Sequence, residues 1–159
     1  MSSWIKEECM TQKATLTTFL WFEKDLEEAL DFYSAIFKDV VIHSKNRMGD
    51  EGPLFTSDFS ILGHEFIGLN WGGGPEFNDS ISLLISCDGQ GEVDYFWDAL
   101  SRDGKPGQCG WLKDRYGLSW QVTPRQMRDY LGDPDPAKAE YAMQALRKMG
   151  KIVLRDFYE

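Results

Sequence analysis

The sequence predicts an α+β protein in which two tandem βαβββ units form a curved mixed sheet around a cleft, followed by C-terminal helices. Three observations lead to this fold class. Patterns typical of a strand, a helix, a strand and a hairpin follow one another, and a strand, a helix and a hairpin then return at a constant spacing. An amphipathic helical segment follows the second hairpin.

The first unit opens with a strand and a strongly patterned helix. Residues 15–22 are rich in β-branched and aromatic side chains, which favours a strand. Asp25 then begins a helix, with Glu28 at the spacing of a capping box. Apolar residues recur at helical spacing and predict one core-facing stripe, made of Leu26, Ala29, Leu30, Tyr33, Ile36 and Phe37.

Shorter segments complete this unit. Residues 40–43 resemble a strand, residues 45–53 a polar loop, and residues 55–71 a hairpin that turns at Gly63-His64. The glycine run 72–74 stands before a proline and a new strand rather than before a helix, so we interpret it as a flexible connector and not as a phosphate cradle.

The second unit repeats the first 63 positions later, an offset that brings Asp25 onto Asp88. We expect a strand over 80–87, a helix after Asp88 and a hairpin over 107–122. The turn of this hairpin is Asp114-Arg115-Tyr116-Gly117, in which Asp favours the first position and Gly accepts positive φ at the last. Two such units can close into an incomplete barrel whose concave side is a cleft.

The remaining residues predict a helical appendage. Residues 126–131 indicate a short helix, and Asp135 followed by Pro136 is a strong start signal for a helix over 137–149. Residues 152–154 resemble a short strand. The apolar stripe of the last helix must cover a sheet, either in its own chain or in a partner, and both alternatives stay open.

These patterns divide one globular domain into four segments. Residues 1–14 form a loose N-terminal arm, residues 15–75 and 76–123 form the two βαβββ units, and residues 124–159 form the helical appendage.

The composition excludes several classes of partner. The formal net charge of −9 repels phosphate backbones, so we expect no nucleic-acid binding. The longest apolar runs are far too short to span a membrane, and the N-terminal residues lack the apolar core of a signal peptide. The sparse, odd set of cysteines (Cys9, Cys87 and Cys109) fits a reducing compartment, and we therefore expect a cytoplasmic protein.

Several segments resemble the vicinal oxygen chelate superfamily, which includes glyoxalase I, bleomycin resistance proteins and extradiol dioxygenases. The chain is similar to its PhnB-like branch, often labelled 3-demethylubiquinone 3-methyltransferase-like, over about residues 15–152. The resemblance implies a glyoxalase-like fold, usually as a homodimer. It rests on Phe19-Leu20-Trp21-Phe22, Glu27-Glu28-Ala29-Leu30-Asp31-Phe32-Tyr33, Leu69-Asn70-Trp71-Gly72-Gly73, Glu92-Val93-Asp94-Tyr95-Phe96-Trp97-Asp98-Ala99-Leu100, Gly107-Gln108-Cys109-Gly110-Trp111-Leu112-Lys113-Asp114 and Asp133-Pro134-Asp135-Pro136-Ala137-Lys138-Ala139.

The same resemblance identifies candidate positions in the cleft. Metal-dependent members place His, Glu or Gln on four strands, and local register puts Thr18, Asn70, Ile81 and Gln121 at those positions. Neutral Thr, Asn and Gln oxygens are weak metal ligands and Ile is none, so we expect no metal and no cofactor. Trp111 stands beside these positions and would suit an apolar or aromatic ligand, although a tryptophan in a small sheet is more often part of the core.

Cys109 is the one candidate nucleophile. Lys113 and Arg115 are close in sequence and would lower the pKa of its thiol if they faced it, but no histidine is placed to act as its base. A free cysteine is more often a small buried hydrophobe.

Three functions remain open from the sequence. The first is a metal-free, cytoplasmic homodimer that binds a small apolar or aromatic molecule. The second is an enzyme that acts on a quinone-like or other small substrate, and the third is a structural subunit without a ligand.

Overall fold

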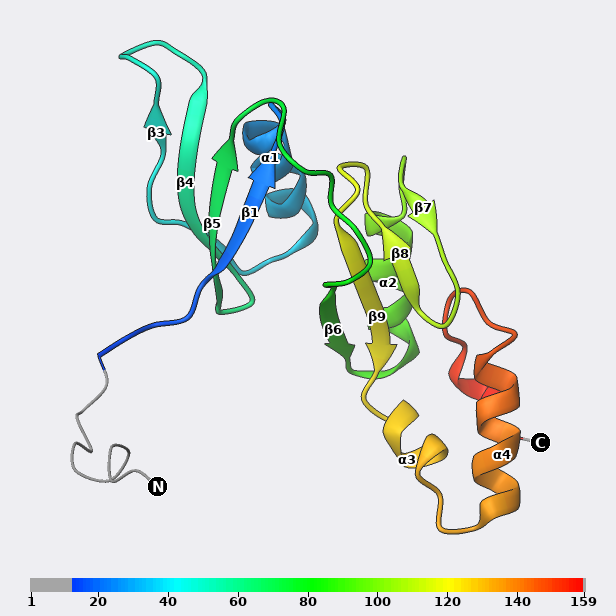
Figure 1. Ribbon diagram of the computed structural model, residues 1–159. Coiled ribbons are helices and arrows are strands. Elements are labelled where there is room, and N and C mark those ends of the chain that lie inside the picture. The colour runs from blue at the N-terminus through cyan, green and yellow to red at the C-terminus, as the bar shows by residue number, and fades with distance from the viewer. Residues whose placement is uncertain (1–12, 159) are drawn as a thin grey trace, which may run out of the picture.

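The computed structural model describes residues 13–158 and contains two βαβββ units followed by helices (Figure 1). The first unit consists of β1 (Thr18–Phe22), α1 (Leu26–Ile36), β2 (Val40–Ile42), β4 (Leu54–Ile61) and β5 (His64–Asn70), with one additional two-residue strand, β3 (Asn46–Arg47), between β2 and β4. The second consists of β6 (Leu83–Cys87), α2 (Gly89–Leu100), β7 (Lys105–Pro106), β8 (Trp111–Lys113) and β9 (Ser119–Pro124). Most of the predicted N-terminal arm, residues 1–12, lies outside the described residues.

The two units share one sheet topology. The strand order is β1-β5-β4-β2 in the first sheet, with β3 also paired to β4, and β6-β9-β8-β7 in the second. In each sheet the first strand runs parallel to the last strand of its unit, and all other pairs are antiparallel. The predicted α+β class with a repeated unit is therefore confirmed, as two mixed sheets.

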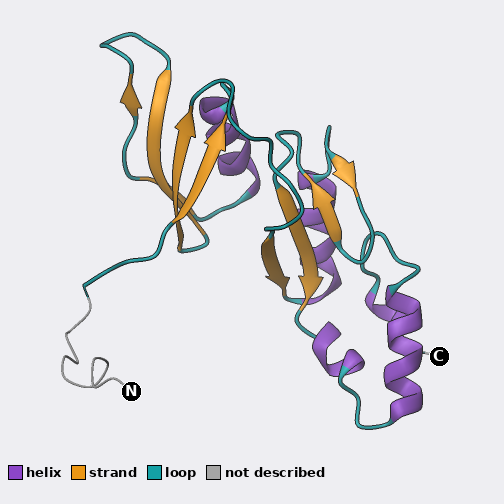
Figure 2. Cartoon of the chain, viewed as in Figure 1, coloured by secondary structure: helices purple, strands orange, loops and turns teal. Residues whose placement is uncertain are grey.

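Each sheet is covered by its helix on one face only (Figures 1 and 2). In β1, Leu20 and Phe22 are buried while Phe19 is exposed, which is the period of two expected for a half-covered sheet. β6 shows the same alternation, with Ile85 and Cys87 buried and Leu84 exposed. We call the uncovered side of each sheet its open face.

The structure corrects the spacing of the repeat. The burial patterns of β1 and β6 coincide when Phe22 is matched to Cys87, which is an offset of 65 and not 63. The loop before α1 contains two more residues than the loop before α2, so an offset taken from the helix starts does not hold for the strands. The equivalent of Thr18 is therefore Leu83.

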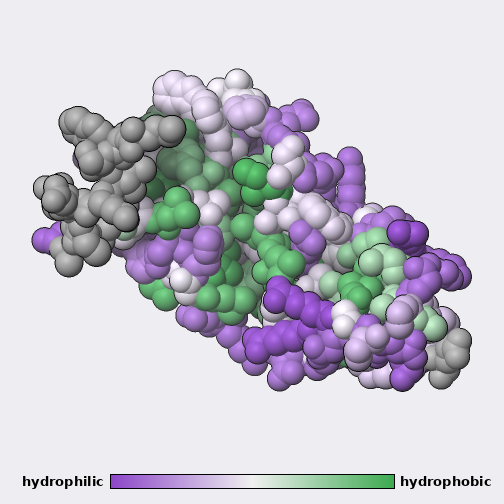
Figure 3. Space-filling view, turned by 60° about the horizontal axis from the view of Figure 1, so that its bottom comes forward, coloured by the Kyte–Doolittle hydropathy of each residue, from purple (hydrophilic) through white to green (hydrophobic). Residues whose placement is uncertain are grey.

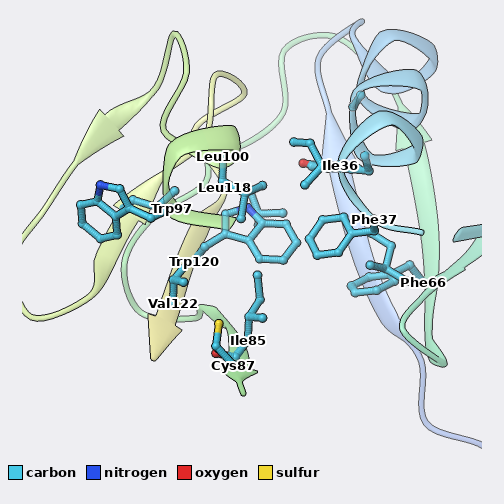
Figure 4. Packing of buried hydrophobic residues seen from close by; sticks show 14 of the residues in the cluster. Ile36, Phe37, Phe66, Ile85, Cys87, Trp97, Leu100, Leu118, Trp120 and Val122 are labelled. Carbon is cyan, nitrogen blue, oxygen red and sulfur yellow. The ribbon is translucent and has the colours of Figure 1, made fainter. Parts of the chain in front are cut away.

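The hydrophobic core continues from one unit into the other. Phe37, at the end of α1, stacks on Phe96 of α2 and on Trp120 of β9, with ring centroids 5.3 and 5.6 Å apart. Figure 4 shows Trp120 pointing from the second sheet toward Phe37. The Tyr95 hydroxyl also donates a hydrogen bond to the Ile36 carbonyl at 2.7 Å. The helix-covered sides of both units thus share one interior, and the open faces remain outside it.

A buried carboxylate lies at the centre of this junction. Asp114 is 3% exposed and accepts hydrogen bonds on one oxygen from the Tyr33 hydroxyl at 2.8 Å and the Trp120 indole at 2.9 Å. Its other oxygen accepts from the backbone N–H groups of Tyr116 and Leu118, which close the predicted hairpin turn. Burial raises the pKa of Asp114, against the opposite effect of the hydrogen bonds. Burial also raises the pKa of Tyr33 well above its usual value, so this phenol stays a donor.

The C-terminal segment contains α3 (Met127–Leu131), α4 (Pro136–Leu146) and the short 3₁₀ helix η1 (Leu154–Phe157). The predicted start of α4 is confirmed, because the Asp135 side chain accepts a hydrogen bond from Ala137 N at 2.9 Å and Pro136 is the first helical residue. The predicted strand over 152–154 is wrong. No helix within residues 13–158 is long and apolar enough to cross a membrane.

This segment is attached to its own chain. The backbone N–H groups of Cys109 and Gly110 donate to the carbonyls of Met149 and Gly150, both at 2.8 Å. Ile152 is fully buried, and its carbonyl accepts a hydrogen bond from the Gln90 amide of α2. Within the chain, α4 packs against α3 and η1, where Ala142 is buried, and the alternative that its apolar stripe covers a partner stays a prediction.

Replacing Asp114 tests the buried junction. In Asp114→Asn the amide NH₂ must face either Trp120 and Tyr33 or the two backbone donors, so a buried donor loses its acceptor in both orientations. We expect a loss of about 2–3 kcal/mol in the free energy of unfolding, measured with urea. Asp103→Asn, which changes an exposed carboxylate paired with Arg115, should cost about 0.5 kcal/mol or less. Equal losses in the two variants would contradict this account.

Candidate functional site

Large apolar side chains are exposed on both open faces. Phe19 is 56% exposed on the first sheet and Leu84 is 49% exposed on the second. In Figure 3, hydrophobic residues gather along the middle of the face shown and hydrophilic residues border them. A large exposed apolar surface of this kind marks a place where a ligand or a partner binds.

Two of the predicted cleft residues meet on the second sheet. Trp111 of β8 and Gln121 of β9 are cross-strand partners, and Leu84 of β6 pairs with Gln121 on its other side. All three lie on the open face, because their neighbours Leu112 and Trp120 are buried against the helix side. The Gln121 amide donates to the Ser82 hydroxyl at 2.8 Å, which leaves its carbonyl oxygen available as an acceptor. The row offers a flat indole, an aliphatic surface and one polar group.

A depression of about 520 Å³ lies beside Trp111. Its lining comes mainly from β7, β8 and the segment between them, and it consists of Asp79, Lys105, Pro106, Gly107, Gln108, Trp111, Leu112 and Lys113. Asp79 binds the Lys113 ammonium at 3.2 Å and accepts a hydrogen bond from the buried Ser119 hydroxyl at 2.7 Å. These two contacts, the Ser119 bond first, lower the pKa of Asp79, which is therefore ionised at neutral pH.

The lysines of this depression were not predicted from the sequence. β7 is only two residues long and falls in a Gly- and Pro-containing stretch that the patterns assign to a loop. The alternation of Trp111 and Lys113 around the buried Leu112 was a usable signal, because it puts both side chains on the open face. Lys105 faces Lys113 only once β7 is known to pair with β8.

Asn70 does not lie on the open face. Its side-chain oxygen accepts a hydrogen bond from Leu26 N at 2.9 Å, and its NH₂ group donates to the Leu54 carbonyl at 2.9 Å. The predicted cap, Asp25, makes no side-chain bond to the helix. Asn70 therefore caps α1 from the neighbouring strand, and its assignment to the cleft is corrected to a structural one.

Thr18 is also placed differently from the expectation. It shares the face of Leu20 and Phe22, and its hydroxyl lies 2.8 Å from His64 Nε2. A one-residue error in register moves a side chain to the opposite face of a sheet, and counting back from Tyr33 passes through a loop where such an error arises. The open-face positions of β1 are Phe19 and Trp21.

Ile81 lies before β6 and is 74% exposed. The offset of 63 brought it into register with Thr18, whereas the strand pairing begins at Leu83. Trp111 and Gln121 are thus together on one open face, and Thr18, Asn70 and Ile81 do not join them.

The four mapped positions do not fit a metal ion. The four side chains do not point to a common centre. The Thr18 hydroxyl, the Asn70 amide and the NH₂ group of Gln121 already form hydrogen bonds with other protein groups. Ile81 has no donor atom. Within residues 13–158, no three His, Cys, Asp or Glu side chains are grouped closely enough to hold a metal. The expectation of a metal-free protein stays a prediction.

Cys109 packs against the C-terminal segment. Its thiol donates to the Leu146 carbonyl at 3.5 Å. The two cations expected to activate it are engaged elsewhere, Lys113 with Asp79 and Arg115 with Asp103 and Glu28. The geometry gives this thiol a packing role, and no side chain among residues 13–158 forms a hydrogen bond with it as a base would.

Comparisons with known proteins agree with this architecture. The profile of a family described as 3-demethylubiquinone-9 3-methyltransferase matches residues 14–123. A putative 3-demethylubiquinone-9 3-methyltransferase, the PhnB protein from Bacillus cereus, is 31% identical over 70% of this chain and 99% of its own, with a TM-score of 0.61. Protein PA1353 from Pseudomonas aeruginosa is 17% identical over 70% of this chain and 97% of its own, with a TM-score of 0.60. No curated protein matches the chain.

The repeated βαβββ units with their open faces define a protein of glyoxalase-like fold. The chain belongs to the PhnB-like family described as 3-demethylubiquinone-9 3-methyltransferase, within the vicinal oxygen chelate superfamily. The family profile ends near the end of β9, so α3, α4 and η1 follow the matched part.

Asn70→Ala tests the corrected role of this residue. Loss of the cap and of the bond to Leu54 should lower the free energy of unfolding by about 1–2 kcal/mol, measured with urea. Asn46→Ala, which removes an exposed amide bonded to Thr56, is the matched control and should cost about 0.5 kcal/mol or less. If Asn70→Ala leaves the free energy of unfolding unchanged, the structural role is contradicted and the original assignment of Asn70 to the ligand cleft is favoured.

Proposed function

We propose that the protein binds a small apolar or aromatic molecule on the open face of its second sheet. The observation that carries the proposal is the row of Leu84, Gln121 and Trp111 beside a depression of about 520 Å³. The Trp111 indole lines the depression and favours a flat apolar ligand, and a ligand that extends from it along the sheet would meet the Gln121 carbonyl as an acceptor and then Leu84.

The volume supports a small ligand. Small-molecule sites usually enclose about 300–1,000 Å³, and they combine mostly apolar walls with few polar groups. The depression beside Trp111 falls within this range and is lined by Trp111, Pro106 and the backbone of Gly107 on its apolar side.

A neutral aromatic probe tests the proposal. We expect 2-naphthamide to produce saturable shifts in the Trp111 indole signal in an NMR titration, and Trp111→Ala to weaken its binding about tenfold. Trp71→Ala, which removes a half-exposed tryptophan of the first unit, should leave the affinity unchanged. Equal weakening in both variants, or no saturable binding, would contradict the proposal. Native mass spectrometry of the purified protein would reveal a retained natural ligand.

The second candidate function is enzymatic. The description of the matched family names a methyltransferase that acts on a demethylated ubiquinone, and it favours a quinone-like or other small substrate for this chain. A rise in melting temperature with S-adenosylmethionine, followed by methyl transfer to such a substrate, would support this candidate over simple binding. A structural subunit would bind neither probe nor cofactor.

We further propose that the protein is a cytoplasmic homodimer. Among residues 13–158, no helix covers the open face of the first sheet, where Phe19 and Val41 are both about half exposed. A second copy is the simplest cover for such a surface, since isolated monomers seldom leave it uncovered.

Phe19→Glu tests the dimer. A charge placed in the interface should shift the protein toward the monomer, measured by light scattering across a concentration series. Ala35→Glu, on the exposed side of α1, should leave the mass unchanged. A monomeric wild-type protein, or a dimer unaffected by Phe19→Glu, would contradict this arrangement.

A further inference from the structure

We propose that the ligand of the depression beside Trp111 is a monoanion, an aromatic or apolar acid whose charge is bound by Lys105. This inference rests on the proposed function and adds the chemical class of the ligand. It depends on a juxtaposition of two lysines that the fold itself does not require.

Lys105 and Lys113 are directly opposite each other on the antiparallel strands β7 and β8. Like charges at such a cross-strand position destabilise a sheet. The placement is notable because the chain as a whole has a formal net charge of −9, so carboxylates are more abundant than cations. Both lysines line the same depression, and their positive charges create a local attraction for an anion there.

Only one of these two charges is neutralised by a protein partner. Lys113 is paired with Asp79 at 3.2 Å, and Ser119 holds that carboxylate in place. Within residues 13–158, Lys105 forms no ion pair. The charged residues that line the depression are therefore two lysines and one aspartate, with a net charge of about +1. One negative charge on the ligand would neutralise it.

The other residues that line the depression indicate that the rest of the ligand is apolar. Trp111 and Pro106 stand on the same depression as Lys105, which places a flat apolar surface beside the free ammonium group. An aromatic carboxylate matches both features, with its ring on Trp111 and its charge on Lys105.

A neighbouring depression limits the charge of the ligand. It has a volume of about 490 Å³ and shares Lys105 and Lys113, but it is also lined by the carboxyl-bearing residues Glu23, Asp25 and Glu76. A second negative charge on the ligand, if it pointed toward that depression, would be repelled by these carboxylates. We therefore expect a monocarboxylate to bind better than a dicarboxylate or a phosphate dianion.

Three probes of the same ring system test the inference. The dissociation constants of 2-naphthoate, 2-naphthamide and naphthalene-2,6-dicarboxylate are measured by NMR titration at low and moderate salt. We expect the wild-type protein to bind 2-naphthoate about five- to tenfold more tightly than the amide, with a preference that falls as salt is added. Lys105→Gln should abolish this preference, and Lys38→Gln, an exposed lysine just after α1, should preserve it.

The outcomes separate this inference from the proposed function. If 2-naphthamide binds as tightly as 2-naphthoate, or if Lys105→Gln keeps the preference, the monoanion inference is overturned while the apolar site stands. Tighter binding of the dicarboxylate would overturn the limit to one charge. If none of the three probes binds, the proposed function itself is contradicted.

Discussion

The buried Asp114 carboxylate joins the two halves of this protein. It belongs to a turn of the second unit, yet one of its oxygens accepts hydrogen bonds from Tyr33 of the first unit and from Trp120 of the second sheet. A buried carboxylate is costly unless donors surround it, and here four donors are supplied by two side chains and two backbone groups. The Tyr33 bond comes from the first unit, and together with the stacking of Phe37 on Phe96 and Trp120 it holds the two sheets in their relative orientation.

That constraint explains where a ligand site is available. The helix-covered sides meet at the junction, where Phe37 of the first unit stacks on Trp120 of the second. Apolar side chains on the opposite sides, such as Phe19 and Leu84, therefore stay exposed although they belong to well-paired strands. The site beside Trp111 arises from this division of each sheet into a packed face and an open face.

The fold class was predictable because strand and helix periods are local properties of the sequence, and both units carry them. The same patterns located the buried stripe of α1 and the start of α4. It was harder to predict which face of a sheet each side chain occupies, because an error of one residue in register moves the side chain to the opposite face, as happened for Thr18. Asn70 was misassigned because its helix-capping partner is 44 positions away in the chain. The lysine pair depends on β7, whose two residues carry no periodic signal.

The most direct test of the central claim is the hydrogen-exchange rate of two indole N–H groups in the same sample. Trp120 donates to the buried Asp114, so its N–H should exchange only through global unfolding and be protected by the full free energy of unfolding. Trp111 lies on the open face and should exchange without unfolding. Comparable protection of the two indoles, or rapid exchange at Trp120, would contradict the claim that the junction is closed and the opposite face open.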